Sequence, residues 1–154
     1  MEEGNSKMEI KILQTEEVPK AVQLARGVFE YCLRNTINEA QLIESFYTYV
    51  REENIRQLME TQKLTIWAAY DEQNNMVAVS GMQSEGHITL LYVMPYYQRR
   101  GYGKKLLLTM REYAREKLEL AQVTVNAMPA WTASYFAKNK FKAVQNPQSV
   151  PYVF

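Results

Sequence analysis

A short stretch near the middle of the chain constrains the fold more than any other. Residues 90–94, Leu-Leu-Tyr-Val-Met, form an apolar run that ends at Pro95, and a helical pattern of apolar residues follows from Gly103 onward. Gly101 and Gly103 lie between the two patterns, and their lack of a Cβ lets the backbone turn sharply and approach a bound anion. The stretch therefore predicts a buried strand, a tight turn and the start of a helix.

The predicted turn has the properties of an anion-binding site. The first amides of an α-helix have no intrahelical acceptor, and the helix dipole adds positive potential there. Arg99, Arg100, Lys104 and Lys105 place four cationic side chains around the turn, so a phosphate or pyrophosphate is its natural ligand. The glycine spacing differs from the dinucleotide-binding fingerprint, and no Gly-Lys-Ser/Thr follows four free positions as in a Walker loop.

Hydrophobic periodicity divides the rest of the chain into strands and helices. The turn formers at 71–75, Asp-Glu-Gln-Asn-Asn, predict a hairpin. In chain order we expect a strand at 9–14, helices at 18–34 and from about 38, strands at 64–70, 76–82 and 87–94, a helix at 103–118, a strand at 122–126, a helix at 130–139 and a strand at 141–145. Residues 52–60 either continue the second helix or form another, and 150–154 could add a last strand. This order predicts an α/β domain whose mixed sheet is antiparallel first and partly parallel later.

Composition limits the classes of protein that the chain can belong to. The 154 residues suffice for one domain, which we expect at 7–154 after a flexible tail at 1–6. Lys and Arg total 18 against 17 Asp and Glu, so no overall charge attracts nucleic acid or an anionic membrane. Cys32 and His87 are the only residues of their types, which argues against a disulfide and a Cys- or His-based metal site. Without an apolar leader or a span of about 20 apolar residues, we expect a cytoplasmic protein.

The turn also carries a family resemblance. Gln98-Arg99-Arg100-Gly101-Tyr102-Gly103 matches the Gln/Arg-x-x-Gly-x-Gly/Ala signature of the GCN5-related N-acetyltransferase (GNAT) family. The preceding Leu-Tyr-Val-x-Pro resembles the fourth strand of that family, 123–126 resembles its fifth, and 134–141 resembles its last helix leading into strand six. The resemblance implies a GNAT-like acyl-CoA N-acyltransferase fold with about six or seven strands, about four helices and a sheet splayed between strands four and five.

The same resemblance implies an activity and a set of cofactor contacts. The chain would transfer acetyl directly from acetyl-CoA to an amine, with no metal. Backbone amides of the loop would hold the pyrophosphate, the fourth strand would pair with the pantetheine arm, and an asparagine and a phenylalanine would contact the arm further along. The residues implied are Gln98, Arg99, Arg100, Gly101, Tyr102, Gly103 and Lys104 for the pyrophosphate, Leu91, Tyr92 and Val93 for pairing, and Asn126 and Phe136 for the pantetheine and its sulfur end.

Acetyl transfer to an amine requires a proton donor for the departing thiolate, and many family members use a tyrosine. Counting nine residues on from Asn126 places Tyr135 at that position, whereas counting back from Phe141 places Phe136 there. We take Tyr135 as the candidate acid. The alternative is a packing aromatic in a chain with 11 tyrosines.

The amine also needs a base, and His87 is the candidate. It lies eleven residues before Gln98, where histone-type members of the family carry a catalytic glutamate. An imidazole with an ordinary pKa near 6.5 suits a base that acts directly or through water. Glu85 is the substitute, and a histidine without a catalytic role at the start of a strand is the alternative.

Other functions remain open at this stage. The arginines and lysines of the turn, interleaved with tyrosines, could bind nucleic acid, but the balanced charge and the glycine spacing favour a cofactor phosphate. A non-catalytic acyl-CoA-binding or sensing module on the same fold is the main alternative, and a homodimer is plausible. The acceptor could be a small molecule or a peptide amine. Five side chains could line its pocket, although core packing is the commoner role for such residues: Tyr31, Tyr47, Tyr49, Trp67 and Met82.

Overall fold

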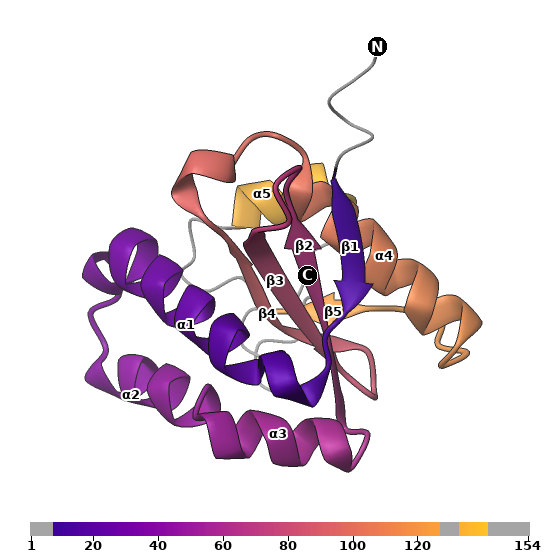
Figure 1. Cartoon of the computed structure of the whole chain (residues 1–154), viewed down its shortest axis with the longest axis horizontal. Helices are drawn as coiled ribbons and strands as arrows, with labels where there is room; N and C mark the ends of the chain where they lie inside the picture. The colour runs from indigo at the N-terminus through magenta and orange to yellow at the C-terminus, as the bar shows by residue number, and fades with distance from the viewer. Residues whose placement is uncertain (1–7, 127–132, 142–154) are drawn as a thin grey trace.

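The computed structural model describes residues 8–126 and 133–141, and these form a sheet covered by helices on both faces (Figure 1). Helices α1, α2 and α3 lie on one face, and α4 crosses the other. The strands are β1 Glu9–Ile12, β2 Leu64–Tyr70, β3 Met76–Gln83, β4 His87–Val93 and β5 Thr124–Val125, and the helices are α1 Val18–Val28, α2 Ala40–Tyr49, α3 Glu52–Glu60, α4 Tyr102–Glu116 and α5 Ala133–Lys138. No described helix is both long and apolar enough to cross a membrane.

The five described strands follow their chain order across the sheet, β1-β2-β3-β4-β5. The first three pairings are antiparallel, and β4 and β5 are parallel. Within the described chain, β4 and β5 pair only at His87 with Thr124 and at Ile88 with Val125. From Thr89 to Val93, the edge of β4 that faces β5 has no strand pairing among residues 8–126 and 133–141, and unpaired backbone groups on such an edge can bind a ligand.

Two apolar cores hold the layers together, one on each face of the sheet. The core under α1 and α3 includes Val18, Val50 and Ile55, and the core under α4 includes Trp67 and Met82. Trp67 packs edge to face against Tyr113 of α4, with ring centroids 5.1 Å apart. Trp67 and Met82 are thus buried core residues, as their strand spacing favours.

The mixed α/β sheet is confirmed, and the strand count is lower than predicted. The described residues contain five strands and five α-helices, whereas about six or seven strands and four helices were expected. The extra helix arises because α2 and α3 are separate, with a break at Val50 and Arg51. Phe141 lies outside any strand, and the strands expected beyond it, to 145 and at 150–154, fall outside the described residues, as does the tail at 1–6.

One helix is less regular than its sequence pattern suggests, and another is described only in part. Regular α1 ends at Val28, and the chain continues as a π-helical turn at Phe29–Leu33 and a 3₁₀ turn at Arg34–Thr36. The apolar spacing does not distinguish the π-helical turn from a regular helix, because that turn still buries Phe29, whereas the three residues of the 3₁₀ turn are exposed. Helix α5 begins at Ala133, after residues that the structure does not describe.

Candidate active site

The predicted strand, turn and helix are present at the end of β4. After Val93, the chain makes a 3₁₀ turn at Pro95–Tyr97 and then a loop, residues 98–101, that leads into α4. Arg99 and Gly101 both adopt left-handed conformations, with φ of +65° and +92°. A Cβ added to Gly101 would contact nothing within 4 Å, so this glycine is favoured by its backbone conformation and not by crowding.

The loop presents backbone amides for which the described residues offer no hydrogen-bond acceptor. Among the described residues, no amide from Arg99 to Lys104 donates to a backbone carbonyl, and the first bond of the helix runs from Lys105 N to Gly101 O at 3.0 Å. Gln98 braces the loop, because its Nε2 donates to the carbonyl of Val93 at 2.9 Å. Free amides at the positive end of a 15-residue helix form a site for an anion.

Four cationic side chains surround this anion site. Arg99, Arg100, Lys104 and Lys105 are all exposed, and none forms an ion pair with a carboxylate in the described part of the chain. Arg100 instead lies over the ring of Tyr96, with its guanidinium 4.4 Å from the ring centroid. An arginine stacked on an aromatic ring keeps its N–H groups available for a phosphate.

The strand residues predicted to contact a cofactor lie on β4, beyond the two residues at which it pairs with β5 in the described chain. Leu91 and Val93 pack against the core under α4, and Tyr92 packs against the core on the other face. Asn126 follows β5 directly and is exposed. The structure therefore places Leu91, Tyr92 and Val93 on β4 and Asn126 at the end of its parallel neighbour, β5.

Tyr135 and Phe136 differ in their surroundings. Phe136 is buried in the core under α4 and contacts Phe141 edge to face. Tyr135 is 38% exposed, and its hydroxyl lies so close to Gly103 that a Cβ there would overlap it. Burial raises the pKa of Tyr135 above its ordinary value of 10.0, which keeps the O–H protonated at neutral pH. Of the two aromatics, only Tyr135 presents a polar group to the loop.

His87 lies at the other end of β4, where β4 still pairs with β5. Its Nδ1 is 2.7 Å from the hydroxyl oxygen of Thr124. Burial lowers the pKa of His87 below 6.5, while the nearby Glu85 carboxylate acts in the opposite direction. Six residue steps separate His87 from Val93, or about 20 Å along a strand. The structure therefore does not bring His87 and Tyr135 together.

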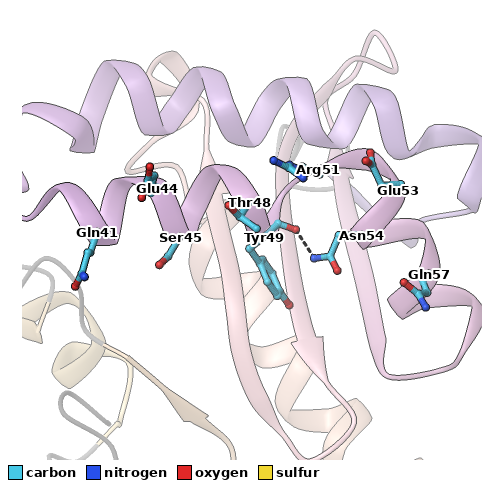
Figure 2. A pocket seen from close by; sticks show the side chains of 9 residues that line it. All are labelled: Gln41, Glu44, Ser45, Thr48, Tyr49, Arg51, Glu53, Asn54 and Gln57. Carbon is cyan, nitrogen blue, oxygen red and sulfur yellow. Dashed lines mark hydrogen bonds between the residues drawn. The ribbon is translucent and has the colours of Figure 1, made fainter.

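A cavity of about 740 Å³ lies along α2 and α3. Figure 2 shows its lining, which is mostly polar and includes the carboxylates of Glu44 and Glu53. Tyr49 belongs to this lining, and its hydroxyl is 2.9 Å from that of Thr89 on β4. Thr89 is the extra residue of a bulge, because Gly81 pairs with Leu90 while Met82 pairs with Ile88. One residue of the cavity lining, Tyr49, is thus hydrogen-bonded to β4 two residues from His87.

Sequence reasoning missed the residues that support the loop from outside. Asp71 accepts a hydrogen bond from the hydroxyl of Tyr97 at 2.8 Å, across 26 residues of sequence. Asp71 was predicted only as a turn former, and Tyr97 only as one of several tyrosines near the basic turn. No local pattern pairs them, because the contact depends on how β2 and β4 lie in the sheet.

A family model described as an acetyltransferase (GNAT) domain matches residues 33–152, which is most of the chain. The chain belongs to the GNAT family. By this membership the protein is an N-acetyltransferase, and the resemblance read from its glycine turn is confirmed. No curated protein matches the sequence.

Solved structures share the same fold. A PaiA N-acetyltransferase from Thermoplasma acidophilum, in complex with coenzyme A, has a TM-score of 0.75 and 18% identity, covering 90% of this chain and 92% of that one. A GCN5-related N-acetyltransferase from Rhodopseudomonas palustris has a TM-score of 0.75 and 20% identity over 94% and 87% of the two chains. An aminoglycoside acetyltransferase from an uncultured soil metagenomic sample has a TM-score of 0.66 and 22% identity over 92% and 93%. At these identities, the similarity shows the fold alone.

Proposed function

We propose that this GNAT protein binds acetyl-CoA at the loop before α4 and transfers the acetyl group directly to the amine of a small acceptor. The observation that carries the proposal is the set of amides between Arg99 and Lys104 that have no partner within the described chain, next to the edge of β4 that is unpaired there. A pyrophosphate bound there would leave the pantetheine arm to run along that edge. The similar Thermoplasma acidophilum protein was solved with coenzyme A, which supports this choice of ligand.

In this proposal each cofactor residue acts through a stated group. Main-chain amides of Arg99, Arg100, Gly101, Tyr102, Gly103 and Lys104 hold the pyrophosphate, and the exposed cations add charge. The amide of Gln98 already donates to Pro95 O at 3.2 Å, so Gln98 contributes through its side chain, which braces the loop. The main chain of Leu91, Tyr92 and Val93 pairs with the pantetheine amides across the unpaired edge. Asn126 approaches the arm from the β5 side, and Phe136 supports it from the core under α4. The acetyltransferase domain would span 7–154, in keeping with the family match at 33–152.

The reaction makes one bond and breaks one. The amine nitrogen attacks the thioester carbon, the new N–C bond forms, the C–S bond breaks, and the nitrogen loses a proton as the thiolate gains one. Positioning the amine against the thioester is the main catalytic device. His87 would take the amine proton, directly or through water. If Nδ1–H donates to Thr124, the lone pair on Nε2 is free for this role.

Tyr135 would donate the proton to the thiolate. Its hydroxyl now lies beside Gly103, so this role requires the side chain to swing away from the loop toward the middle of β4. Its raised pKa suits a donor, because the hydroxyl keeps its proton at neutral pH. The proposal thus requires Tyr135 to change position when the cofactor binds.

The cavity along α2 and α3 is the proposed acceptor site. Its lining carries two glutamates against one arginine, Arg51, and this excess of negative charge favours a cationic amine. Tyr49 of the lining is hydrogen-bonded to Thr89 in the bulge on β4. Similar structures include the aminoglycoside acetyltransferase and a spermidine N-acetyltransferase from Vibrio cholerae, the latter with a TM-score of 0.62 and 12% identity over 91% of this chain and 82% of that one. These names support small polyamines and amino sugars as the first acceptors to test.

The test is release of free thiol from acetyl-CoA in the presence of a panel of amines that includes spermidine, aminoglycosides, amino acids and lysine peptides. We expect turnover with at least one small polycationic amine. Tight binding of coenzyme A without turnover on any amine would contradict the proposal and favour the non-catalytic sensing module. Turnover only on lysine peptides or protein N-termini would reject the small acceptor but keep the transfer reaction.

A further inference from the structure

We propose that Asp71 and Tyr97 are positioning residues that hold the loop, residues 98–101, in its anion-binding shape and so set the affinity for acetyl-CoA rather than the rate of transfer. This inference rests on the proposed function, because it assumes that the loop binds the pyrophosphate. Neither residue lies among the proposed cofactor contacts. Both act on the loop from the side of the β2–β3 hairpin.

Asp71 is a rigid anchor. It directly follows β2, its side chain is 9% exposed, and its Oδ1 accepts hydrogen bonds from Gln73 N at 3.0 Å and Asn75 N at 2.9 Å. Those bonds fix the carboxylate to the hairpin turn between the two most extensively paired strands. The hydrogen bond from Asn75 N is the main reason that the pKa of Asp71 is lowered, and the carboxylate is therefore charged at neutral pH.

Tyr97 connects this anchor to the loop. Its hydroxyl donates to Asp71 Oδ2 at 2.8 Å, and it is the last residue before Gln98. Its ring lies edge to face against Tyr102, the first residue of α4, with centroids 5.9 Å apart. Arg100 lies over the same ring at 5.6 Å. Tyr97 thus contacts both ends of the loop and one of its cations.

The loop needs such external support because of its own conformation. Arg99 and Gly101 are both left-handed, and for a residue with a Cβ, such as Arg99, this conformation costs about 1–2 kcal/mol. Inside the loop region, Gln98 supplies one brace through its bond to Val93 O. Without the Asp71–Tyr97 bond, the loop would relax toward conformations in which its amides no longer converge on one anion.

The charge of Asp71 also argues for a positioning role. A carboxylate near a pyrophosphate site opposes anion binding through space, so its presence there has to be explained by something else. Its oxygens accept from two backbone amides, the Tyr97 hydroxyl and, at 3.5 Å, the Asn75 side chain. The carboxylate therefore accepts hydrogen bonds from several segments at once, and these donors stabilise its negative charge.

The chain offers a matched control for this bond. Tyr70, the residue before Asp71, also donates its hydroxyl to a carboxylate, Glu17 Oε2, at 2.9 Å. That bond ties β2 to the segment before α1 and does not touch the loop. Tyr97→Phe and Tyr70→Phe each remove one phenol–carboxylate hydrogen bond of similar length. Only the first should affect cofactor binding.

The experiment compares both variants with wild type by calorimetric titration with coenzyme A and by steady-state kinetics. For Tyr97→Phe we expect Kd for coenzyme A and KM for acetyl-CoA to rise about tenfold or more, with kcat at saturation unchanged, since a hydrogen bond to a charged group is of at least that strength. For Tyr70→Phe we expect a similar loss of thermal stability with Kd unchanged. Asp71→Asn combined with Tyr97→Phe should raise Kd no more than the larger single effect, because both changes break the same connection.

Two results would overturn the inference while leaving the proposed function intact. One is an unchanged Kd for Tyr97→Phe in a chain that binds coenzyme A. The other is an equal rise in Kd for both tyrosine variants, which would indicate general destabilisation. If the wild-type chain binds no coenzyme A, both the proposed function and this inference fail.

Discussion

Replacing Gly101 with alanine tests the loop at its most constrained position. Gly101 has φ of +92°, and a Cβ there would meet nothing within 4 Å, so the substitution adds backbone strain without a clash. A left-handed residue with a Cβ costs about 1–2 kcal/mol, of which about 0.4–1 kcal/mol is offset because alanine restricts the unfolded chain. We therefore expect a net loss of roughly 1 kcal/mol, or a Tm lower by about 2–4 °C for a domain of this size.

The effect on cofactor binding should exceed the effect on stability. If the loop relieves the strain by changing shape, its amides lose their common direction, and a cost of about 1–2 kcal/mol corresponds to a 5- to 30-fold weaker Kd for coenzyme A. Thermal unfolding and calorimetric titration measure the two quantities.

Gly27→Ala is the control for this substitution. Gly27 lies near the end of α1, and a Cβ there would also meet nothing within 4 Å. Because alanine is the better helix former, we expect the control to gain about 0.5–1 kcal/mol in stability and to bind coenzyme A normally. Unchanged coenzyme A affinity in Gly101→Ala would refute the assignment of this loop to the pyrophosphate.

Three further predictions concern the proposed catalytic and acceptor residues. Tyr135→Phe should lower kcat at least tenfold with little change in Kd for coenzyme A, as measured by thiol release and titration, and an unchanged kcat would remove Tyr135 as the acid. His87→Gln should abolish the fall in kcat/KM at acid pH. Burial lowers the pKa of His87 below 6.5, so protonation of its imidazole destabilises the folded state. The stability of the wild-type chain should therefore also decline below pH 6.5, and it should decline less in the variant. Glu44→Gln should raise KM for a polyamine acceptor several-fold and leave KM for acetyl-CoA unchanged, and equal changes in both would argue against the cavity as the acceptor site.

Local patterns in the sequence were sufficient to predict the elements whose conformation depends on neighbouring residues. The glycine spacing at Gly101 and Gly103 predicted the turn, because a left-handed backbone and a close approach both favour residues without a Cβ. Alternation and turn formers predicted the β2–β3 hairpin for the same kind of reason. The mixed sheet followed from the order of these elements.

Features that depend on tertiary contacts could not be predicted from local sequence patterns. The spacing from Asn126 favours Tyr135 as the acid, and the spacing from Phe141 favours Phe136. The two residues differ in burial, since Phe136 packs in the core while the hydroxyl of Tyr135 reaches Gly103. The bond between Asp71 and Tyr97 joins segments whose proximity depends on the sheet. A sequence also does not show that His87 and Tyr135 lie at opposite ends of β4, because this depends on where α5 packs.

The most direct test of the central claim compares coenzyme A with pantetheine, which lacks the pyrophosphate, by calorimetric titration of the wild-type chain. If the amides between Arg99 and Lys104 hold the pyrophosphate, two or more charged hydrogen bonds of about 1.5 kcal/mol each are lost with pantetheine. Coenzyme A should then bind at one molecule per chain and about a hundredfold more tightly than pantetheine. Equal affinity for the two compounds would contradict the account.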